Sequence, residues 1–190
     1  DAFDRVDILI NAARMFCTTD PLDPTDNSVE LALGQNLHVA LRLSQAVARR
    51  MISQAETDEQ TTNDVGTIVN LSSVAAHRTQ PELLAFSIST AALEQMTRSL
   101  AVSLAPHHIR VNAIAVGSVM SGSLRDVIAE HNYYRDSIIA GTPMRRIGTA
   151  NEVAEAAQFL ASPASSFMTG QVIGLDGGRS VLDTVQRPAH

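Results

Sequence analysis

The sequence predicts an α/β fold with a doubly wound parallel sheet, and three observations support this class. Short apolar segments alternate along the chain with longer segments of helical periodicity, as in sheets whose parallel strands are joined by helices. The apolar segments are rich in Val and Ile, as expected for strands that are buried on both faces. Hydrophobic residues make up 45% of the 190 residues and charged residues 18%, which indicates one folded domain with a sizeable core.

The first half of the chain carries two predicted strands and one predicted helix. Residues 6–11 form a short apolar run closed by an asparagine, and a loop rich in Pro, Asp and Thr follows. Apolar residues then recur at helical spacing over residues 27–53. After a polar, acidic segment, residues 67–73 are predicted to form a second strand, because the segment is apolar and begins with β-branched residues.

The second half repeats this alternation. Pro81 and Glu82 are predicted to open a helix over residues 81–105, because both residue types suit a first helical turn, and Pro106 ends it. A mostly polar, partly helical region covers residues 118–146. The remaining predicted elements are a strand at 109–116, a helix N-capped by Asn151, and a short strand within 170–178 that ends in a turn at Asp176-Gly177-Gly178.

Composition and charge exclude several classes of function. The net charge is −6 and the charges are scattered, so we expect neither a nucleic-acid partner nor a membrane. Cys17 is the only cysteine, which rules out an internal disulfide, and no Cys/His spacing suggests a metal site. No apolar run reaches about 18 residues, and the first residues lack the features of a signal peptide. A reduced, cytoplasmic setting is therefore expected.

The basic residues have an unusual composition. All 14 of the Lys and Arg residues are arginines, so the sequence contains no lysine. Any mechanism that requires a lysine amine is therefore excluded within these residues. Tyrosine occurs only at Tyr133 and Tyr134, which are neighbours.

Four segments, taken in order and with their spacing, resemble one protein family. They are VDILINAAR at 6–14, GTIVNLSS at 66–73, RVNAIAVGSVMSG at 110–122 and SSFMTGQVIGLDGG at 165–178. Through them, residues 1–180 are similar to the carboxy-terminal two-thirds of a short-chain dehydrogenase/reductase. The resemblance implies a Rossmann-like sheet that holds the equivalents of family strands 4 to 7. It also implies hydride transfer between a nicotinamide cofactor and a carbonyl or alcohol carbon.

The resemblance assigns four catalytic positions, of which two are retained. Ser73 stands at the serine that hydrogen-bonds the substrate oxygen, and Asn36 at the asparagine that holds a water in the proton relay. Phe86 replaces the catalytic tyrosine and Thr90 the catalytic lysine. A phenyl ring has no proton to give, and threonine carries no charge that could lower a tyrosine pKa. Because a positioned proton donor contributes roughly 10²–10⁴-fold in rate, we expect the family's mechanism to be impaired.

Other groups could replace the missing acid. His77 follows Ser73 by four residues, and histidine titrates near neutrality, but this residue can equally be a loop histidine that faces water. Tyr133 and Tyr134 fall in the region that covers the substrate in the family, where aromatic side chains more often pack over a pocket than act as acids. Ser72 is expected to face away from Ser73, because neighbours on a strand point to opposite sides.

The expected cofactor site also departs from the family. Where the family has N-N-A-G, the chain has Asn11-Ala12-Ala13-Arg14, so Arg14 brings a long cationic side chain to a position at which glycine passes close to the cofactor. Arg14 is expected to point to solvent, to contact a phosphate in place of the lost cation, or to block the site. Through the resemblance, the expected contacts with NAD or NADP are Asn11, Ala12, Ala13, Arg14, Val116, Gly117, Val119 and Ser121.

Some family features do not occur in these residues. The glycine-rich T-G-x-x-x-G-x-G turn, and the residue that selects NAD from NADP, would lie before Asp1 in the family. We therefore expect one Rossmann-like domain over residues 1–190 that lacks the N-terminal dinucleotide-binding units, with residues 6–11 as an uncovered sheet edge. The helices at 27–53 and 81–105 match those that form a four-helix bundle between family subunits, which implies a homodimer or homotetramer.

Together these observations predict a member of an NAD(P)-dependent oxidoreductase family whose catalysis is impaired. Two alternatives stay open. One is an active carbonyl or alcohol oxidoreductase that uses a non-standard proton donor such as His77, in which case a small-molecule substrate is expected. The other is a fragment, or a structural or binding homologue, without turnover. No metal is expected.

Overall fold

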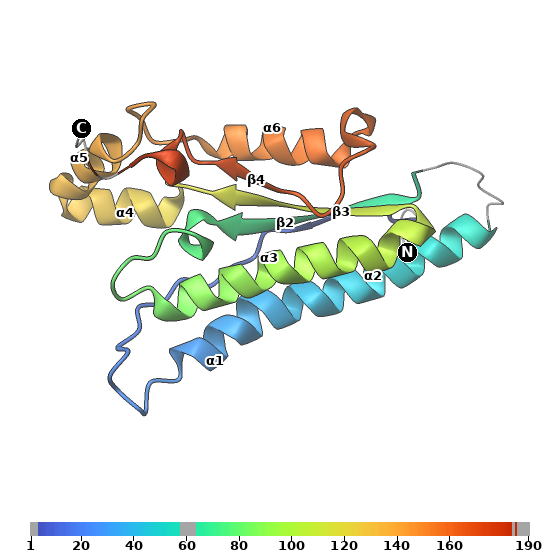
Figure 1. Cartoon of the computed structure of the whole chain (residues 1–190), viewed down its shortest axis with the longest axis horizontal. Helices are drawn as coiled ribbons and strands as arrows, with labels where there is room; N and C mark the ends of the chain where they lie inside the picture. Colours follow the sequence, from blue (N-terminus) through green and yellow to red (C-terminus); the bar gives the residue numbers. More distant parts are fainter. Residues whose placement is uncertain (1–3, 58–63, 184, 186–190) are drawn as a thin grey trace.

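The computed structural model describes residues 4–57, 64–183 and 185, and it has three layers (Figure 1). A sheet of four parallel strands lies between helices on its two faces. The strands, which pair in this order, are β1 (Ile8–Asn11), β2 (Gly66–Ser73), β3 (Ile109–Val116) and β4 (Val172–Leu175). The predicted α/β class and its parallel, Rossmann-like sheet are therefore confirmed.

Helices cover the two faces unequally (Figure 1). One face carries α1 (Ser28–Ala32), a π-helical turn (Leu33–His38), α2 (Val39–Thr57) and α3 (Leu84–Leu104), and the other carries α6 (Ala150–Ala161). Beyond the carboxyl ends of the strands lie α4 (Gly122–Glu130) and α5 (Asn132–Ala140). Short 3-10 turns occur at Val74–Ala76, Ala105–His107, Pro163–Ser165 and Arg179–Val181. Within the described ranges, no helix combines the length and the apolar character needed to cross a membrane.

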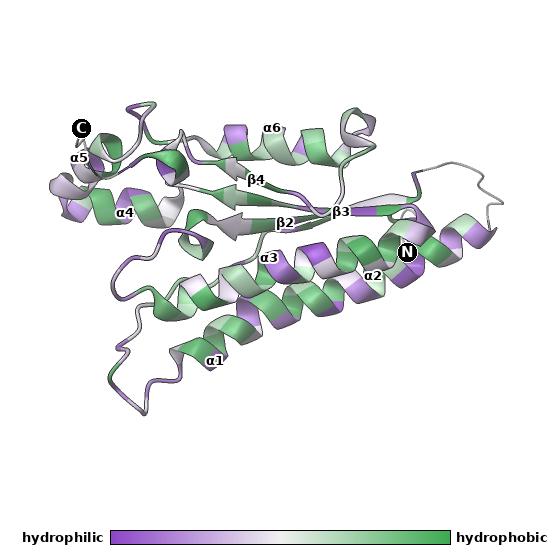
Figure 2. Ribbon diagram, in the orientation of Figure 1, coloured by the Kyte–Doolittle hydropathy of each residue, from purple (hydrophilic) through white to green (hydrophobic). Residues whose placement is uncertain are grey.

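The sheet divides the hydrophobic core into two parts. Between the sheet and α2 and α3, the buried residues are Ala48, Met51, Ile68, Ala101, Ile109 and Val111. On the α6 side they are Val69, Ile114, Val116, Ala157 and Leu160. Figure 2 shows long hydrophobic stretches along α3 and along the carboxyl half of β3, the elements that lie at the centre of this packing. Burial of both faces explains why β2 and β3 read as continuous apolar runs.

The first two predicted elements have different boundaries in the structure. β1 begins at Ile8 rather than at residue 6, because the backbone N–H and C=O of Val6 both bond the Gln54 side-chain amide, at 2.9 Å each. The helix predicted over 27–53 continues to Thr57 and contains the π-helical turn. Such turns are frequent at functional sites, and this one includes Asn36.

Two predicted helix starts are wrong. α3 begins at Leu84, and Pro81 and Glu82 lie in the preceding turn, where Glu82 has a φ of +66°. α6 is capped by Thr149 instead of Asn151, because the Thr149 hydroxyl and the Glu152 side chain form a capping box. The expected turn at Asp176-Gly177-Gly178 is confirmed: both glycines have positive φ, and the Asp176 carboxylate accepts the Gly178 N–H at 2.8 Å.

Arg110 of β3 ties the sheet to the carboxyl end of α6. Its buried guanidinium donates to the carbonyl oxygens of Leu160 (3.0 Å), Ser165 (3.1 Å) and Ser162 (3.4 Å). The last carbonyls of a helix lack partners within the helix, and they favour a positive charge. The Arg110 Nε also lies 3.7 Å from a carboxylate oxygen of Asp64, which is partly exposed.

We expect the replacement Arg110→Met to lower the free energy of unfolding by about 3 kcal/mol, because it removes the charge-assisted hydrogen bonds to the carbonyl oxygens of Leu160, Ser162 and Ser165. Asp64→Asn is the matched control. It removes only the partly exposed charge, so a loss below about 1 kcal/mol is expected. Chemical denaturation followed by circular dichroism measures both values. Equal losses in the two variants would mean that the ion pair, rather than the capping of α6, is the important contact.

Candidate functional site

The predicted site residues gather at the carboxyl ends of the strands, where parallel α/β sheets bind ligands. Asn11, Ser73 and Val116 are the last residues of β1, β2 and β3. Phe86 and Thr90 lie in the first two turns of α3, which packs against β2 and β3. The fold thus brings the four positions assigned by resemblance into one region, although it supplies neither a tyrosine nor a lysine there.

Phe86 is part of an apolar cluster. Its side chain is only 5% exposed and packs with Ala75 and Leu83. On its outer side lies Phe16, whose ring centroid is 5.3 Å away at an interplanar angle of 59°. Tilted aromatic pairs at this distance are favourable. An aromatic contact therefore occupies the position at which the family has its acid.

Thr90 is turned back onto its own helix. Its hydroxyl lies 2.9 Å from the carbonyl oxygen of Phe86 and 3.1 Å from that of Ser87, and the residue is buried. This local bonding is common for threonine inside helices. Thr90 therefore presents no cation and no free donor to a ligand at the end of the sheet.

Asn36 uses its whole side-chain amide inside the protein. Its Oδ1 accepts the Met15 N–H at 2.6 Å, while its Nδ2 donates to the Met15 carbonyl at 3.0 Å and to the Ser89 hydroxyl at 2.9 Å. The amide thus joins three segments: the π-helical turn, the loop after β1, and α3. This arrangement fixes the loop that carries Phe16.

Thr19 fixes the same loop at a second point, and the sequence analysis did not identify it. Thr19 is buried, and its N–H donates to the Glu82 carbonyl at 2.8 Å. The Thr19 hydroxyl accepts the Ala85 N–H at 3.1 Å and lies 2.9 Å from the Ser28 hydroxyl. Leu83, the N-cap residue of α3, makes no side-chain cap, so a residue 66 positions away from Ala85 caps the helix instead. Only the folded chain brings this donor and acceptor together.

Ser73 and Ser72 face different partners, as predicted from strand alternation. The Ser73 oxygen accepts the Ala75 N–H at 3.2 Å, which leaves the hydroxyl proton able to donate to a ligand. Ser72 is fully buried and donates to Glu94 Oε1 at 2.9 Å. Ser72 therefore belongs to the contact between β2 and α3.

His77 is not a free surface histidine. Its Nε2 lies 2.9 Å from Glu94 Oε2, and its side chain is 51% exposed. Glu94 is only 1% exposed. Its buried carboxylate contacts His77 through Oε2 and accepts the Ser72 hydroxyl at Oε1. The sequence analysis missed Glu94, although one signal was present: Glu94 is the only acidic residue of α3.

The segment after β1 is divided between the interior and solvent. The Asn11 amide donates to Asn70 Oδ1 at 2.8 Å and to the Ser44 hydroxyl at 3.1 Å, so it supports the sheet from inside. Ala12, Ala13 and Arg14 are exposed. Desolvation by the surrounding protein lowers the pKa of Arg14, and within the described residues Arg14 has no hydrogen-bond or ion-pair partner.

The segment after β3 is shaped by close contacts. Val116 is buried in the core on the α6 side. A Cβ at Gly117 would lie 2.7 Å from the Cβ of Asp176, which explains why glycine is found there. Val119 pairs with Gly148 in an isolated parallel bridge, and the Ser121 hydroxyl caps α4 by accepting the Leu124 N–H at 3.1 Å.

Other parts of the chain add little to this site. Tyr133 and Tyr134 are exposed and stack on each other with ring centroids 4.5 Å apart; their hydrogen bond raises the pKa of Tyr133. Within the described ranges, no group of three His, Cys, Asp or Glu residues could hold a metal ion.

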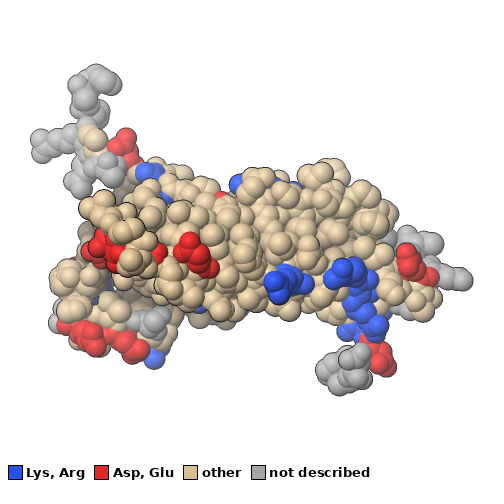
Figure 3. Space-filling view, turned by 90° about the horizontal axis from the view of Figure 1, so that it is seen from below, with Lys and Arg blue, Asp and Glu red and all other residues tan. Residues whose placement is uncertain are grey.

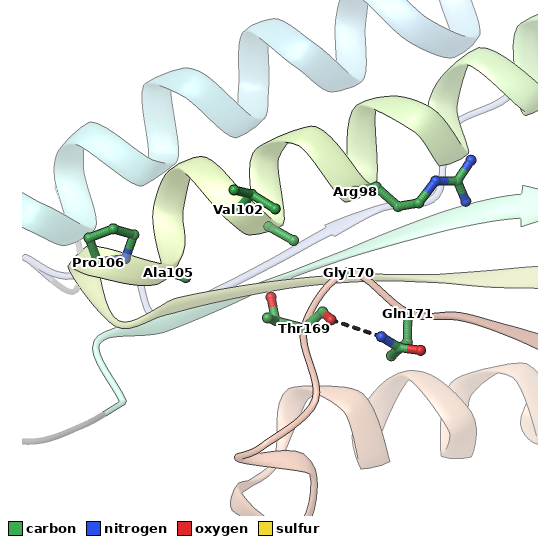
Figure 4. Close-up of a pocket in the computed structure, with 8 residues that line it drawn as sticks. Arg98, Val102, Ala105, Pro106, Thr169, Gly170 and Gln171 are labelled. Atoms are coloured by element: carbon green, nitrogen blue, oxygen red, sulfur yellow. Dashed lines mark hydrogen bonds between the residues drawn. The ribbon is translucent and has the colours of Figure 1, made fainter.

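A hollow of about 550 Å³ lies at the opposite, amino-terminal edge of the sheet (Figure 4). Its lining residues are Arg98, Ala101, Val102, Ala105, Pro106, Thr169, Gly170 and Gln171, none of which is a predicted site residue.

Comparison with known proteins gives consistent results. The sequence model of a family described as enoyl-(acyl carrier protein) reductase matches residues 1–180. The short-chain reductase protein NovJ of Streptomyces niveus is 33% identical over 183 residues, which are 94% of this chain and 66% of that protein. Galactitol 2-dehydrogenase of Rhizobium johnstonii is 39% identical over 176 residues, which are 90% of this chain and 64% of that protein.

A solved structure matches in the same way. A gluconate 5-dehydrogenase from Burkholderia cenocepacia, in complex with NADP and tartrate, superposes with a TM-score of 0.82 at 28% identity. The match covers 94% of this chain and 66% of that one. This chain thus spans about two thirds of the length of the relatives that it matches.

We expect His77 and Glu94 to be energetically coupled. Single replacements His77→Ala and Glu94→Gln and the double variant form a mutant cycle, and we expect a coupling free energy of about 1–2 kcal/mol from denaturation curves. The physical reason is that a buried carboxylate oxygen loses its hydrogen-bond partner when the histidine is removed. Additivity of the two single effects would show that water replaces His77 without cost. His107→Ala, on the 3-10 turn after α3, is the control histidine.

Proposed function

The chain belongs to the short-chain dehydrogenase/reductase family, and we propose that it is a member in which the proton-transfer step of hydride exchange is impaired. The observation that carries this proposal is the pair of residues on α3. Phe86 packs into an apolar cluster, and the Thr90 hydroxyl is directed to helix carbonyls. An NAD(P)-dependent carbonyl or alcohol oxidoreductase needs a proton donor next to the substrate oxygen, and neither side chain can be one.

Ser73 and Asn36, the two retained catalytic positions, are suited to orienting a ligand rather than to transferring a proton. The Ser73 hydroxyl proton can donate to a carbonyl oxygen, whereas the Asn36 amide is already engaged with Met15 and Ser89. A lone serine donor polarises a carbonyl only weakly, because it does not transfer a proton to the product oxygen. These contacts favour a protein that binds a carbonyl or alcohol compound and turns it over slowly or not at all.

A nicotinamide cofactor, NADP or NAD, is proposed as a ligand of the whole protein. NADP is bound to the Burkholderia relative. In this chain, the small exposed side chains of Ala12 and Ala13 leave the end of β1 open, whereas Gly117 at the end of β3 is packed against Asp176. Arg14 adds bulk and Thr90 cannot hold a ribose, so the fit is partial. When bound, the cofactor would supply the hydride; these residues would only position its nicotinamide end.

We further propose that residues 1–190 form one Rossmann-like domain that lacks the glycine-rich dinucleotide-binding units. About a third of the length of these relatives lies outside the match. Ile8 and Ile10 of β1 are large apolar side chains left about half-exposed. A further parallel strand with its helix would cover them. In the whole protein, such units would carry the pyrophosphate site.

A homodimer or homotetramer is proposed through the face formed by α1, α2 and α3. Figure 3, which views this side, shows few charged side chains over its middle. Large hydrophobic residues are exposed along these helices: Leu31, Val39, Leu43, Leu84, Ile88 and Val102. Such a surface is suited to contact with a second copy.

One alternative has a specific observation in its favour. Glu94 accepts the Nε2 side of His77, so it could fix the tautomer and orientation of the imidazole, as carboxylates do for catalytic histidines. An active oxidoreductase that uses His77 as its acid would then lose its turnover in a His77→Ala variant.

The central test restores the missing groups. We expect the wild-type protein to oxidise NADPH or NADH no faster than background with a panel of ketones and aldehydes. The double replacement Phe86→Tyr with Thr90→Lys should raise the rate by about 10²-fold or more, because the tyrosine regains a proton and the lysine lowers its pKa. Phe86→Tyr alone should gain little, since an unassisted tyrosine has a pKa of about 10.

Steady-state spectrophotometry at 340 nm measures these rates. The control pair is Phe159→Tyr with Thr149→Lys, which makes the same substitutions on α6 and at its N-cap, away from the site. Turnover by the wild-type protein at a rate that the double replacement does not improve would disprove impairment. Loss of that turnover in His77→Ala would then favour the alternative.

A further inference from the structure

The turn after β4 is fixed in place at the carboxyl end of the sheet. The Asp176 carboxylate accepts the N–H groups of Gly178 and Ser180 at 2.8 Å and 2.7 Å. From the loop after β2, the guanidinium of Arg78 donates through Nε and Nη2 to the Ser180 carbonyl oxygen, with the Nε contact at 2.9 Å. Arg179 lies between Gly178 and Ser180, so its backbone is held on both sides.

Arg179 keeps two of its donor groups unused. Its Nη1 donates to the Ser118 hydroxyl oxygen at 2.9 Å, and the residue is partly buried. Within the residues that the structure describes, its Nε and Nη2 have no hydrogen-bond or ion-pair partner. The N–H groups of Nε and Nη2 are parallel on one edge of the planar guanidinium, and they match the two oxygens of a carboxylate.

No carboxylate among the described residues is paired with Arg179. Asp176 and Asp183 belong to the same segment, but each accepts backbone N–H groups of its own turn, at 2.7 to 2.8 Å. Arg78, a second cation on this segment, is bonded to carbonyl oxygens only. Because Arg179 is partly shielded from water, an anion that reaches it is bound more strongly than at a fully hydrated surface.

Arg179 also lies close to Ser73, the retained serine. In the register of β2 and β3, Ser73 is opposite Val116, and Ser118 follows Val116 by two residues. Paired strands lie about 5 Å apart and two residues extend at most about 7 Å, so the Cα atoms of Ser73 and Ser118 are within about 12 Å of each other. A ligand roughly six to eight atoms long is therefore sufficient to join the Ser73 hydroxyl to the Arg179 guanidinium.

This pair of groups is remote from the sheet edge at β1. Ser73, Ser118 and Arg179 follow β2, β3 and β4, and β4 is the opposite edge strand of the described sheet. The units that we propose for the whole protein would lie beside β1, on the far side of β2 and β3 from the turn that carries Arg179. The unpaired edge of its guanidinium is therefore independent of those units.

We infer that Arg179 selects a ligand with a carboxylate group, which pairs with Nε and Nη2, while the Ser73 hydroxyl donates to a carbonyl or hydroxyl oxygen at the other end of the same molecule. This inference rests on the proposed function, because it takes Ser73 as a ligand contact. It narrows the carbonyl and alcohol compounds proposed above to oxo acids and hydroxy acids of medium length.

Isothermal titration calorimetry with the complete protein measures the binding of 6-oxoheptanoate and of its neutral methyl ester. We expect the acid to bind at least about tenfold more tightly, since only the acid offers a carboxylate. Arg179→Gln should weaken the acid about tenfold or more and leave the ester unchanged. Arg179→Lys, which keeps the charge, should bind the acid more tightly than Arg179→Gln. Ser73→Ala should weaken both probes about threefold or more.

Arg42→Gln, an equivalent change at an exposed arginine on α2, is the control and should bind the acid like the wild type. Thermal melts of each variant check that the fold is kept. Equal binding of the acid and the ester, or an Arg179→Gln variant that binds the acid normally, overturns the inference. So does inorganic phosphate that binds more tightly than the acid and is lost in Arg179→Gln, because Arg179 would then serve a phosphate group.

The two proposals can fail separately. Reduction of neutral ketones by the wild-type protein contradicts impaired catalysis, whatever Arg179 binds. Failure of the acid to bind more tightly than its ester contradicts the ligand class, and it leaves the rates of the Phe86 and Thr90 variants to decide the proposed function.

Discussion

The structure depends on one constraint: the polar groups that β2 buries under α3 must each find a partner on that helix. Asn70 donates to the Thr97 hydroxyl at 2.9 Å, and Ser72 donates to Glu94 at the same distance. A buried polar group without a partner costs about 1–3 kcal/mol. These two contacts, which lie less than one turn apart on the helix, therefore determine both the rotation of α3 and its position along the strand. Apolar packing alone would tolerate small slips of the helix.

Because of this constraint, the position of α3 does not depend on the side chains at the catalytic positions. Because Thr97 and Glu94 align α3, the first two turns of the helix lie at the carboxyl end of the sheet whatever residues occupy them. Phe86 finds an apolar cluster there, and the Thr90 hydroxyl finds helix carbonyls. Asn36 continues to fasten the loop after β1 to Ser89. The start of α3 and the loop after β1 are thus held in place by hydrogen bonds that involve neither Phe86 nor the Thr90 hydroxyl.

The sequence was sufficient for the fold class, because the parallel α/β class follows from the alternation of strand and helix periodicity, and the Rossmann-like sheet was implied by the family resemblance. It was insufficient where distant partners decide. The start of β1 depends on Gln54, and the cap of α3 depends on Thr19. The pairing of His77 with Glu94 joins residues 17 apart that only the β2–α3 packing brings together. One error was avoidable: the T-x-x-E pattern at Thr149 and Glu152 signals a capping box.

The local satisfaction of Thr90 has a consequence for the history of such a chain. A lysine introduced there alone would place a cation among buried neighbours with no tyrosine to assist, and a tyrosine introduced alone at Phe86 would put a hydroxyl into a cluster of hydrocarbon. Under the proposed function, each single step costs stability and restores little activity. Recovery of the family's proton transfer would therefore need both changes together.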